Sequence, residues 1–114
     1  MITEFSFGRI IVSGIVYTDD LKIIQNRVIP QWWRKRGHRV DVEDLEDIMA
    51  FKPDILVLGK GEPGRMAASS STRRLLEQNG IVLIEEKTSR AVRSFNRLLQ
   101  EGERRVAAGI HVSC

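Results

Sequence analysis

The stretch over residues 53–64, PDILVLGKGEPG, constrains the fold most, because an apolar run passes directly into a glycine-rich segment. Residues 55–58 contain no polar side chain, which is typical of a strand buried on both faces of a covered sheet. Pro53 disfavours helical geometry in the residue before it and so ends the preceding element. Because α/β sheets commonly bind ligands at the carboxyl ends of their strands, the sequence predicts a candidate site there.

Residues 59–64, called the glycine loop below, combine a cation with three glycines: Gly59, Gly61 and Gly64. Backbone amides together with the ammonium of Lys60 could hold a small anion. The alternative is a tight surface connection with one solvated lysine. The spacing Gly-x-Gly-x-x-Gly is weak evidence for a dinucleotide site, because the loop lies mid-chain and Glu62 and Pro63 would obstruct a pyrophosphate.

A length of 114 residues fits one domain, and we expect a single domain over residues 1–114. Hydrophobic residues make up 42% and charged residues 29%, which is the composition of a globular chain rather than a disordered one. The net charge of +3, from 18 basic and 15 acidic residues, permits an anionic partner without indicating one.

The chain has no apolar stretch long enough to cross a membrane, and its first residues, MITEF, do not resemble a secretory or transit signal. Cys114 is the one cysteine, which excludes an internal disulfide and suits a reducing compartment. We therefore expect a cytoplasmic protein without a membrane partner.

Hydrophobic periodicity predicts an α/β arrangement of about three helices and a parallel or mixed sheet. The first residues and residues 10–17 are expected to form an N-terminal β-hairpin, with a bulge or a close backbone approach at Gly14. One of the serines at 69–71 should cap a helix that runs to residue 78, and Thr88 should cap a helix over residues 89–101. The other expected elements are a helix over residues 42–51 and strands over residues 21–24, 28–29, 81–84 and 105–112. The strands over residues 55–58 and 81–84 should be parallel.

Residues 32–39, WWRKRGHR, have the most unusual composition in the chain. Two tryptophans among basic residues could bind nucleic acid by stacking and charge. Neighbouring residues of a strand face opposite sides, however, so both rings cannot join one platform. We favour one tryptophan in the core and the other partly exposed, which makes a nucleic-acid partner an unfavoured interpretation.

Catalytic and metal-binding patterns are weak. The serines at 69–71 have no histidine near them in sequence, so helix capping explains them better than nucleophilic catalysis. His111 and Cys114 are three residues apart, a spacing that on a strand points them to opposite faces. We therefore expect no metal site and interpret His111 as a partly buried, hydrogen-bonded residue.

The chain resembles the Mth-domain family of small α/β proteins. The matching segments cover nearly the whole chain in order: Phe7-Gly8, Trp33-Arg34, Gly37-His38, Glu43-Asp44-Leu45, residues 53–61, Asn79-Gly80-Ile81, Thr88-x-x-Ala91-x-x-x-Phe95-Asn96-x-Leu98, Glu101-Gly102-x-x-Arg105-Val106-Ala107-Ala108 and His111-x-x-Cys114. The chain departs from the family in carrying Gly59-Lys60-Gly61 where Gly-Thr-Gly is usual, which puts any role of that threonine hydroxyl in doubt here.

The resemblance implies a three-layer fold with a mixed central sheet, an additional β-hairpin and helices on one side. It implies no catalytic residues and no cofactor. Family members linked to a function act as assembly or interaction factors, among them a mitochondrial complex I assembly factor.

Two functional hypotheses follow. The favoured one is a non-enzymatic binding or assembly module for a protein partner, a second copy of the chain or a small anionic ligand. The alternative is a small-molecule-binding enzyme that acts at the glycine loop, where polar groups converge at the strand ends. The candidate ligand-binding residues are Trp33, Arg34, His38, Gly59, Lys60, Gly61, Gly64, Thr88, Asn96 and His111.

Overall fold

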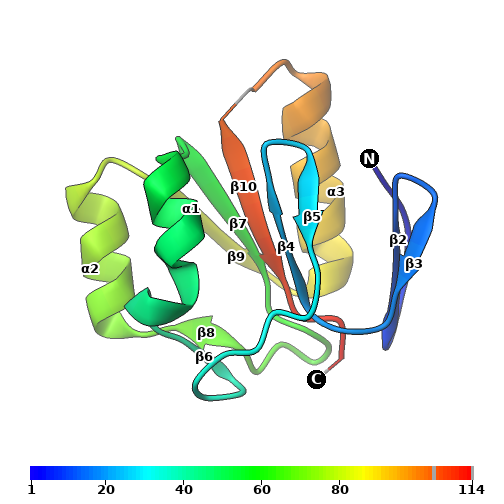
Figure 1. Cartoon of the computed structure of the whole chain (residues 1–114), viewed down its shortest axis with the longest axis horizontal. Coiled ribbons are helices and arrows are strands. Elements are labelled where there is room, and N and C mark those ends of the chain that lie inside the picture. Colours follow the sequence, from blue (N-terminus) through cyan, green and yellow to red (C-terminus); the bar gives the residue numbers. More distant parts are fainter. Residues whose placement is uncertain (104, 114) are drawn as a thin grey trace.

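The computed structural model describes residues 1–103 and 105–113, and a five-stranded mixed sheet lies at its centre (Figure 1). The strands follow the order β5 (Arg27–Ile29), β4 (Leu21–Ile24), β10 (Val106–Ile110), β7 (Ile55–Gly59) and β9 (Val82–Glu86). β7 is parallel to both β10 and β9, whereas β4 is antiparallel to both β10 and β5. The predicted mixed sheet, with residues 55–58 and 81–84 in parallel strands, is confirmed.

Side chains alternate along the central strands and so enter two separate hydrophobic cores. In β7, Val57 belongs to the first core, whereas Leu56 and Leu58 belong to the second. In β10, Ala108 faces the first core and Ala107 the second. All five residues are fully buried, so the prediction of a strand covered on both faces is confirmed.

The first core lies between the sheet, helix α3 (Thr88–Gln100) and a small antiparallel sheet of β1 (Ile2–Ser6), β2 (Arg9–Val12) and β3 (Ile15–Tyr17). Helix α3 contributes Ala91, Val92 and Phe95 to this core, at the helical spacing that the sequence shows. The side-chain amide of Asn96 binds both the N–H and the carbonyl of Ile2, at 3.1 and 2.6 Å, and so fastens β1 to the helix.

The expected single strand over residues 10–17 is wrong. Ser13 and Gly14 form a tight turn between β2 and β3, and both have positive φ, at 48° and 83°. Two successive residues with positive φ make the hairpin turn whose twist matches that of antiparallel strands. Gly14 therefore reverses the chain instead of forming a bulge, and the N-terminal unit has three strands rather than two.

The second core lies on the opposite face of the sheet, beneath a 3₁₀ helix η1 (Val42–Leu45), α1 (Glu46–Phe51) and α2 (Ser70–Gln78) (Figure 1). A short parallel pair, β6 (Arg39–Val40) and β8 (Ala67–Ala68), closes this side. Helices thus cover both faces, and the expectation of helices on one side is wrong. The apolar side chains of these helices explain this, since Leu45, Ile48 and Leu76 contact the second core while α3 fills the first.

The predicted helix over residues 42–51 is present as η1 followed by α1. Ser69 is the predicted serine cap of α2: its hydroxyl accepts the N–H of Thr72 at 3.2 Å. The two tryptophans divide as expected, since Trp32 is 4% exposed and Trp33 is 71% exposed. The basic residues around Trp33 therefore lie at the surface, while Trp32 anchors their segment in the second core.

Gly109 in β10 is a glycine whose lack of a side chain the packing requires. A Cβ at this position would lie 2.9 Å from two carbons of the Trp32 ring and 3.0 Å from Leu58. The Trp32 ring therefore lies directly against this face of β10. A Cβ at residue 109 therefore cannot be accommodated without displacing the Trp32 ring or the strand.

We expect Gly109→Ala to lower the free energy of unfolding by about 1–3 kcal/mol, because overpacking forces core side chains away from their preferred positions. Gly37→Ala is the matched control, since a Cβ there meets nothing within 4 Å and Gly37 does not have positive φ. Urea denaturation of both variants provides the measurement. Equal stability of the two variants would contradict the contact with Trp32.

Candidate functional site

The carboxylate of Asp20, in the connection between β3 and β4, joins two side chains that are distant in sequence. Its Oδ2 accepts the Nη2–H of Arg34 at 2.8 Å and lies 2.8 Å from Nδ1 of His111. Its Oδ1 accepts the backbone N–H of Val112 at 2.8 Å. The side chains are almost buried, with 11% of Asp20, 4% of Arg34 and 8% of His111 exposed. We call Asp20, Arg34 and His111 the Asp20 cluster.

The hydrogen bonds of the cluster keep Asp20 ionised. Burial alone raises the pKa of this carboxyl, but the bonds from His111, the Val112 amide and Arg34 together outweigh it and hold the pKa below its ordinary value. An ionised carboxylate only accepts hydrogen bonds, so Nδ1 of His111 must carry a proton. The remaining ring nitrogen, Nε2, then faces away from Asp20 and is free to act as an acceptor or, when the ring is charged, as a donor.

Arg34 is fixed from three sides. Its Nε and Nη2 donate to the carbonyl of Gly37 at 3.0 and 2.7 Å, which closes the segment that follows the tryptophans. The guanidinium also lies over the Trp32 ring, with 4.7 Å between its central carbon and the ring centroid, in a cation–π contact. Together with Asp20, these contacts hold the group in one orientation.

The glycine loop and Thr88 lie directly behind His111. The N–H of His111 donates to the carbonyl of Gly59 at 2.9 Å, and the hydroxyl of Thr88 donates to the carbonyl of His111 at 2.6 Å. The same hydroxyl accepts the N–H of Gly61 at 2.8 Å. The expected role of Thr88 as a helix cap is therefore wrong: the residue lies inside the first turn of α3, and its hydroxyl joins the loop to the final segment.

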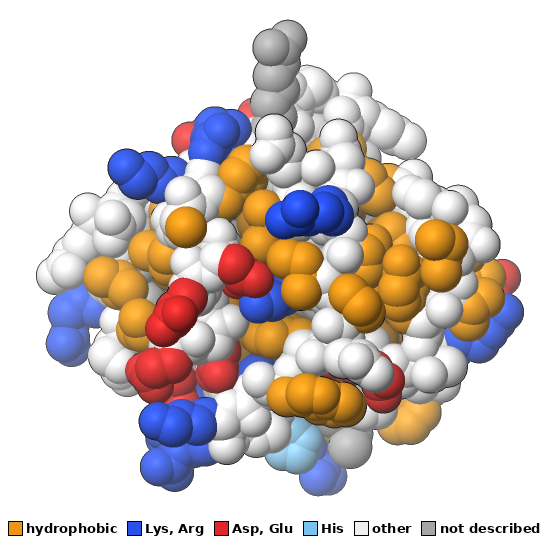
Figure 2. Space-filling model, in the orientation of Figure 1, with side chains coloured by type: hydrophobic (Ala, Val, Ile, Leu, Met, Phe, Trp, Pro, Cys, Tyr) orange, Lys and Arg blue, Asp and Glu red, His pale blue; other side chains and the backbone are white. Residues whose placement is uncertain are grey.

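A cavity of about 310 Å³ opens beside the Asp20 cluster. It is lined by Thr18, Asp19, Asp20, Trp32, Trp33, Arg34, Gly37, His38, His111, Val112 and Ser113. The His38 ring lies edge-on to that of His111, with 5.7 Å between the ring centroids. Figure 2 shows a histidine side chain beside a broad hydrophobic side chain at the lower edge of the molecule.

Two buried nitrogens of the lining residues have no hydrogen-bond partner within the described part of the chain: Nη1 of Arg34 and Nε2 of His111. Buried polar atoms are nearly always paired in proteins, because an unpaired one loses its bonds to water without replacement. Both nitrogens belong to side chains that the same Asp20 oxygen holds. The arrangement therefore fits a ligand that supplies the missing hydrogen bonds.

Three consecutive amides of the glycine loop are already bonded within the chain and are not free for a ligand. The N–H of Lys60 donates to Glu86, that of Gly61 to Thr88 and that of Glu62 to Ser113, at 2.8, 2.8 and 2.9 Å. The carboxylate of Glu62 also accepts the N–H and the hydroxyl of Ser89 at the start of α3, where an anion would otherwise bind. These bonds hold the pKa of Glu62 below its ordinary value.

The structure thus brings together four predicted candidates at the cavity, Trp33, Arg34, His38 and His111, with Gly59, Gly61 and Thr88 supporting them from behind. Lys60, Gly64 and Asn96 do not line the cavity. Sequence reasoning missed Asp20, the residue that joins the cluster. Its neighbours Thr18 and Asp19 give the local pattern of a turn, and its partners lie 14 and 91 residues away.

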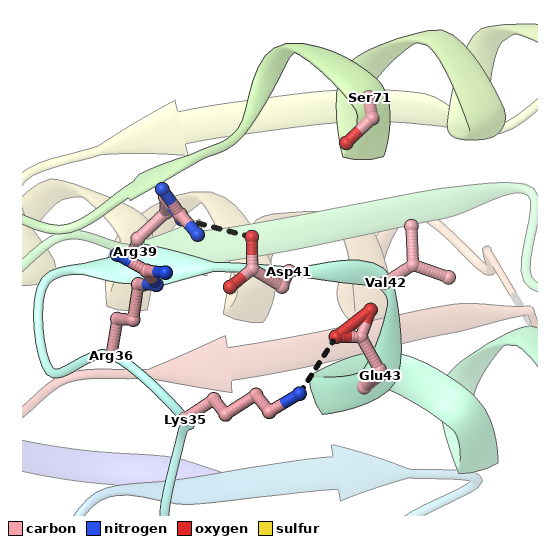
Figure 3. A pocket seen from close by; sticks show the side chains of 7 residues that line it. All are labelled: Lys35, Arg36, Arg39, Asp41, Val42, Glu43 and Ser71. Atoms are coloured by element: carbon pink, nitrogen blue, oxygen red, sulfur yellow. Dashed lines mark hydrogen bonds and ion pairs between the residues drawn. The ribbon is translucent and has the colours of Figure 1, made fainter.

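A second depression, of about 490 Å³, lies between β6, η1 and the start of α2 (Figure 3). Four of its charged side chains are paired: Arg39 lies 2.9 Å from Asp41, and Lys35 lies 3.9 Å from Glu43. Arg36 lies on the same rim in Figure 3. These side chains are largely exposed except Asp41, so solvent already satisfies them and the depression offers less to a ligand than the cavity at the Asp20 cluster.

Within residues 1–103 and 105–113, no helix has the length and apolar character that crossing a membrane requires. The same residues hold no group of three or more histidine, cysteine, aspartate or glutamate side chains placed to bind a metal ion. Cys114, considered above as a ligand beside His111, lies outside the described residues.

Comparison with known proteins matches nearly the whole chain. The family model described as "Protein of unknown function (DUF498/DUF598)" matches residues 2–111. The conserved hypothetical protein PH1505 from Pyrococcus horikoshii OT3 is 26% identical, with a TM-score of 0.84, and the match covers 100% of this chain and 99% of that one.

Two solution structures share the fold at lower identity. Xanthomonas campestris XCC1710 is 20% identical with a TM-score of 0.85, and the match covers 98% of this chain and 83% of that one. A Bordetella pertussis protein described as a Mth938-like domain is 19% identical with a TM-score of 0.75, and the match covers 98% of this chain and 85% of that one.

Proposed function

Because the chain belongs to the family described as "Protein of unknown function (DUF498/DUF598)", we propose its function from its own geometry: it is a binding module that holds a small anionic ligand between Arg34 and His111. Membership also confirms the resemblance to Mth-domain proteins that the sequence motifs indicate. A protein partner, a second copy of the chain, an enzymatic reaction at the glycine loop and a cytoplasmic location stay predictions.

One observation carries the proposal. Arg34 Nη1 and His111 Nε2 are buried and unpaired within the described residues, and both side chains line one cavity. A guanidinium N–H donates to carboxylate, phosphate or sulfate oxygens with a strength that neutral donors do not reach. Because Asp20, Gly37 and Trp32 already hold the guanidinium, a ligand meets a donor that is fixed before it binds.

The experiment is a titration with sulfate at about pH 6, monitored by calorimetry and by backbone NMR, with chloride adjusted to keep the ionic strength constant. We expect saturable binding with shifts at the amides of residues 34–38 and 111–113. Arg34→Gln should weaken binding by at least about tenfold, because it removes a charged donor. Arg34→Lys should also weaken it, since lysine keeps the charge but not the planar fork.

Arg36→Gln is the matched control, because Arg36 is exposed and lines the second depression rather than the cavity. It should leave the sulfate affinity within about twofold. Absence of saturable binding by the wild-type protein would overturn the proposal. So would an equal loss in Arg36→Gln, which would move the anion to the depression in Figure 3.

A further inference from the structure

The charges of the Asp20 cluster cancel before any ligand is bound. Arg34 carries one positive charge and Asp20 one negative charge, 2.8 Å apart, and both side chains are nearly inaccessible to water. Adding an anion therefore leaves the buried group with a net negative charge, which is unfavourable in a poorly solvated site. Asp19, which also lines the cavity, adds a further negative charge. A compensating positive charge is needed.

The structure holds one group that can supply this charge at the right atom. With its Nδ1 proton directed at Asp20, a neutral His111 presents a lone pair at Nε2. A lone pair repels an oxyanion. Protonation turns the same atom into a charged donor, and the Asp20 carboxylate 2.8 Å away stabilises the resulting imidazolium.

We propose that the site takes up its anion together with one proton, which binds at Nε2 of His111, so that the ligand class is an oxyanion held between two charged donors. The inference rests on the proposed function and specifies the chemical class of the ligand. Carboxylates and phosphate or sulfate esters share the required feature, two oxygens on one centre that can accept from Arg34 Nη1 and His111 Nε2. Neutral ligands lack the negative charge that the added proton compensates.

The consequence is a pH-dependent affinity. Imidazole is the side chain that ordinarily changes charge between about pH 5 and 8, so the oxyanion should bind more tightly at the acidic end of that range. His38 is the one other titratable ring at the cavity, and its edge-on position at 5.7 Å makes it the alternative proton acceptor. Arg34 stays charged throughout, and Asp20, whose pKa is lowered, stays ionised.

The test measures sulfate affinity at about pH 6 and about pH 8, because sulfate keeps its own charge over this range and any pH effect belongs to the protein. We expect the affinity to fall at least about tenfold between the two values. Calorimetry in two buffers of different ionisation enthalpy should show uptake approaching one proton per sulfate at the higher pH. The ring ¹⁵N signals of His111 should move to the doubly protonated pattern when sulfate binds.

His111→Gln and His38→Gln form the matched pair. His111→Gln should bind sulfate with little pH dependence, whereas His38→Gln should keep the wild-type dependence. Sulfate affinity that is equal at both pH values, or a dependence lost only in His38→Gln, would overturn this inference and leave the binding module standing. No binding at either pH would remove the proposed function itself. The ring ¹⁵N measurement on the wild-type protein decides the assignment even where a variant does not fold.

Discussion

Replacing Asp20 by alanine is expected to lower the free energy of unfolding by about 3–5 kcal/mol, the cost of removing one partner from a buried ion pair. The change removes both carboxylate oxygens from Arg34, His111 and the Val112 amide at once. Arg34 would then keep its charge in a side chain only 4% exposed, without a counter-ion. Because natural domains are stable by about 5–15 kcal/mol, this is a large fraction of the total.

Urea denaturation compares the variant with Asp19→Ala, which removes a neighbouring carboxylate that has no hydrogen bond or ion pair among the described residues. The control should stay within about 0.5 kcal/mol of the wild type. Asp20→Asn keeps the shape of the side chain. Its loss of stability should be smaller, so it can be measured even where the alanine variant is too unstable. Similar losses in Asp19→Ala and Asp20→Ala would show that the cluster contributes nothing particular to stability.

The Asp20 carboxylate also makes the free energy of unfolding depend on pH. Since the pKa of Asp20 is lower in the folded chain than in the unfolded one, its stabilisation is fully present above the unfolded value of about 4 and is lost as the pH falls through the folded value. The wild-type free energy of unfolding should therefore decrease with acidification below about pH 4. In Asp20→Asn this part of the decrease should be absent, which unfolding curves measured between about pH 2 and 5 would show.

Replacing Trp32 by alanine is expected to cost about 3–5 kcal/mol as well, but through loss of packing. The ring is 4% exposed, fills the space that Gly109 leaves in β10, and donates its Nε1–H to the carbonyl of Asp44 at 3.1 Å. Its removal also takes away the surface on which Arg34 rests. The variant should therefore lose both stability and the sulfate binding proposed above.

Trp33→Ala is the natural control, because it removes an identical side chain one residue later that is 71% exposed. Its free energy of unfolding should stay within about 0.5 kcal/mol of the wild type. Trp32→Phe, which keeps an aromatic ring but loses the bond to Asp44, should fall between the two. Equal losses at both tryptophans in urea denaturation would contradict the division into a buried and an exposed ring.

The sequence predicts those parts of the fold that short-range patterns determine. The apolar run at 55–58 and the helical spacing of Ala91, Val92 and Phe95 are local signals, and the structure confirms both elements. The turn at Ser13–Gly14 is not predictable from the sequence, because one strand that contains a glycine has nearly the same composition as two strands joined by a turn that contains a glycine. Helices lie on both faces because the apolar sides of different helices pack into different cores. A local sequence pattern does not indicate which face of the sheet a given helix covers.

The candidate site is predictable only in part for the same reason. Arg34 and His38 attract notice beside two tryptophans, and their segment does line the cavity. Asp20 has no such neighbours, and its role exists only when it approaches Arg34 and His111 in the folded chain. The glycine loop shows the opposite error. Its composition is typical of a loop that binds an anion through its amides, but Glu86, Thr88 and Ser113 accept the amides of residues 60–62, and sequence reasoning did not place these partners beside the loop.

The order of strands has a consequence for how this chain is made. β10 leaves the ribosome after every other strand of the central sheet, yet it lies in the middle, bonded to β4 on one side and to β7 on the other. A nascent chain that has not reached residue 106 therefore carries two unpaired strand edges, which are templates for pairing with other chains. Asp20, made early, meets its histidine only 91 residues later, so the chain must be translated through residue 113 before the cavity can exist.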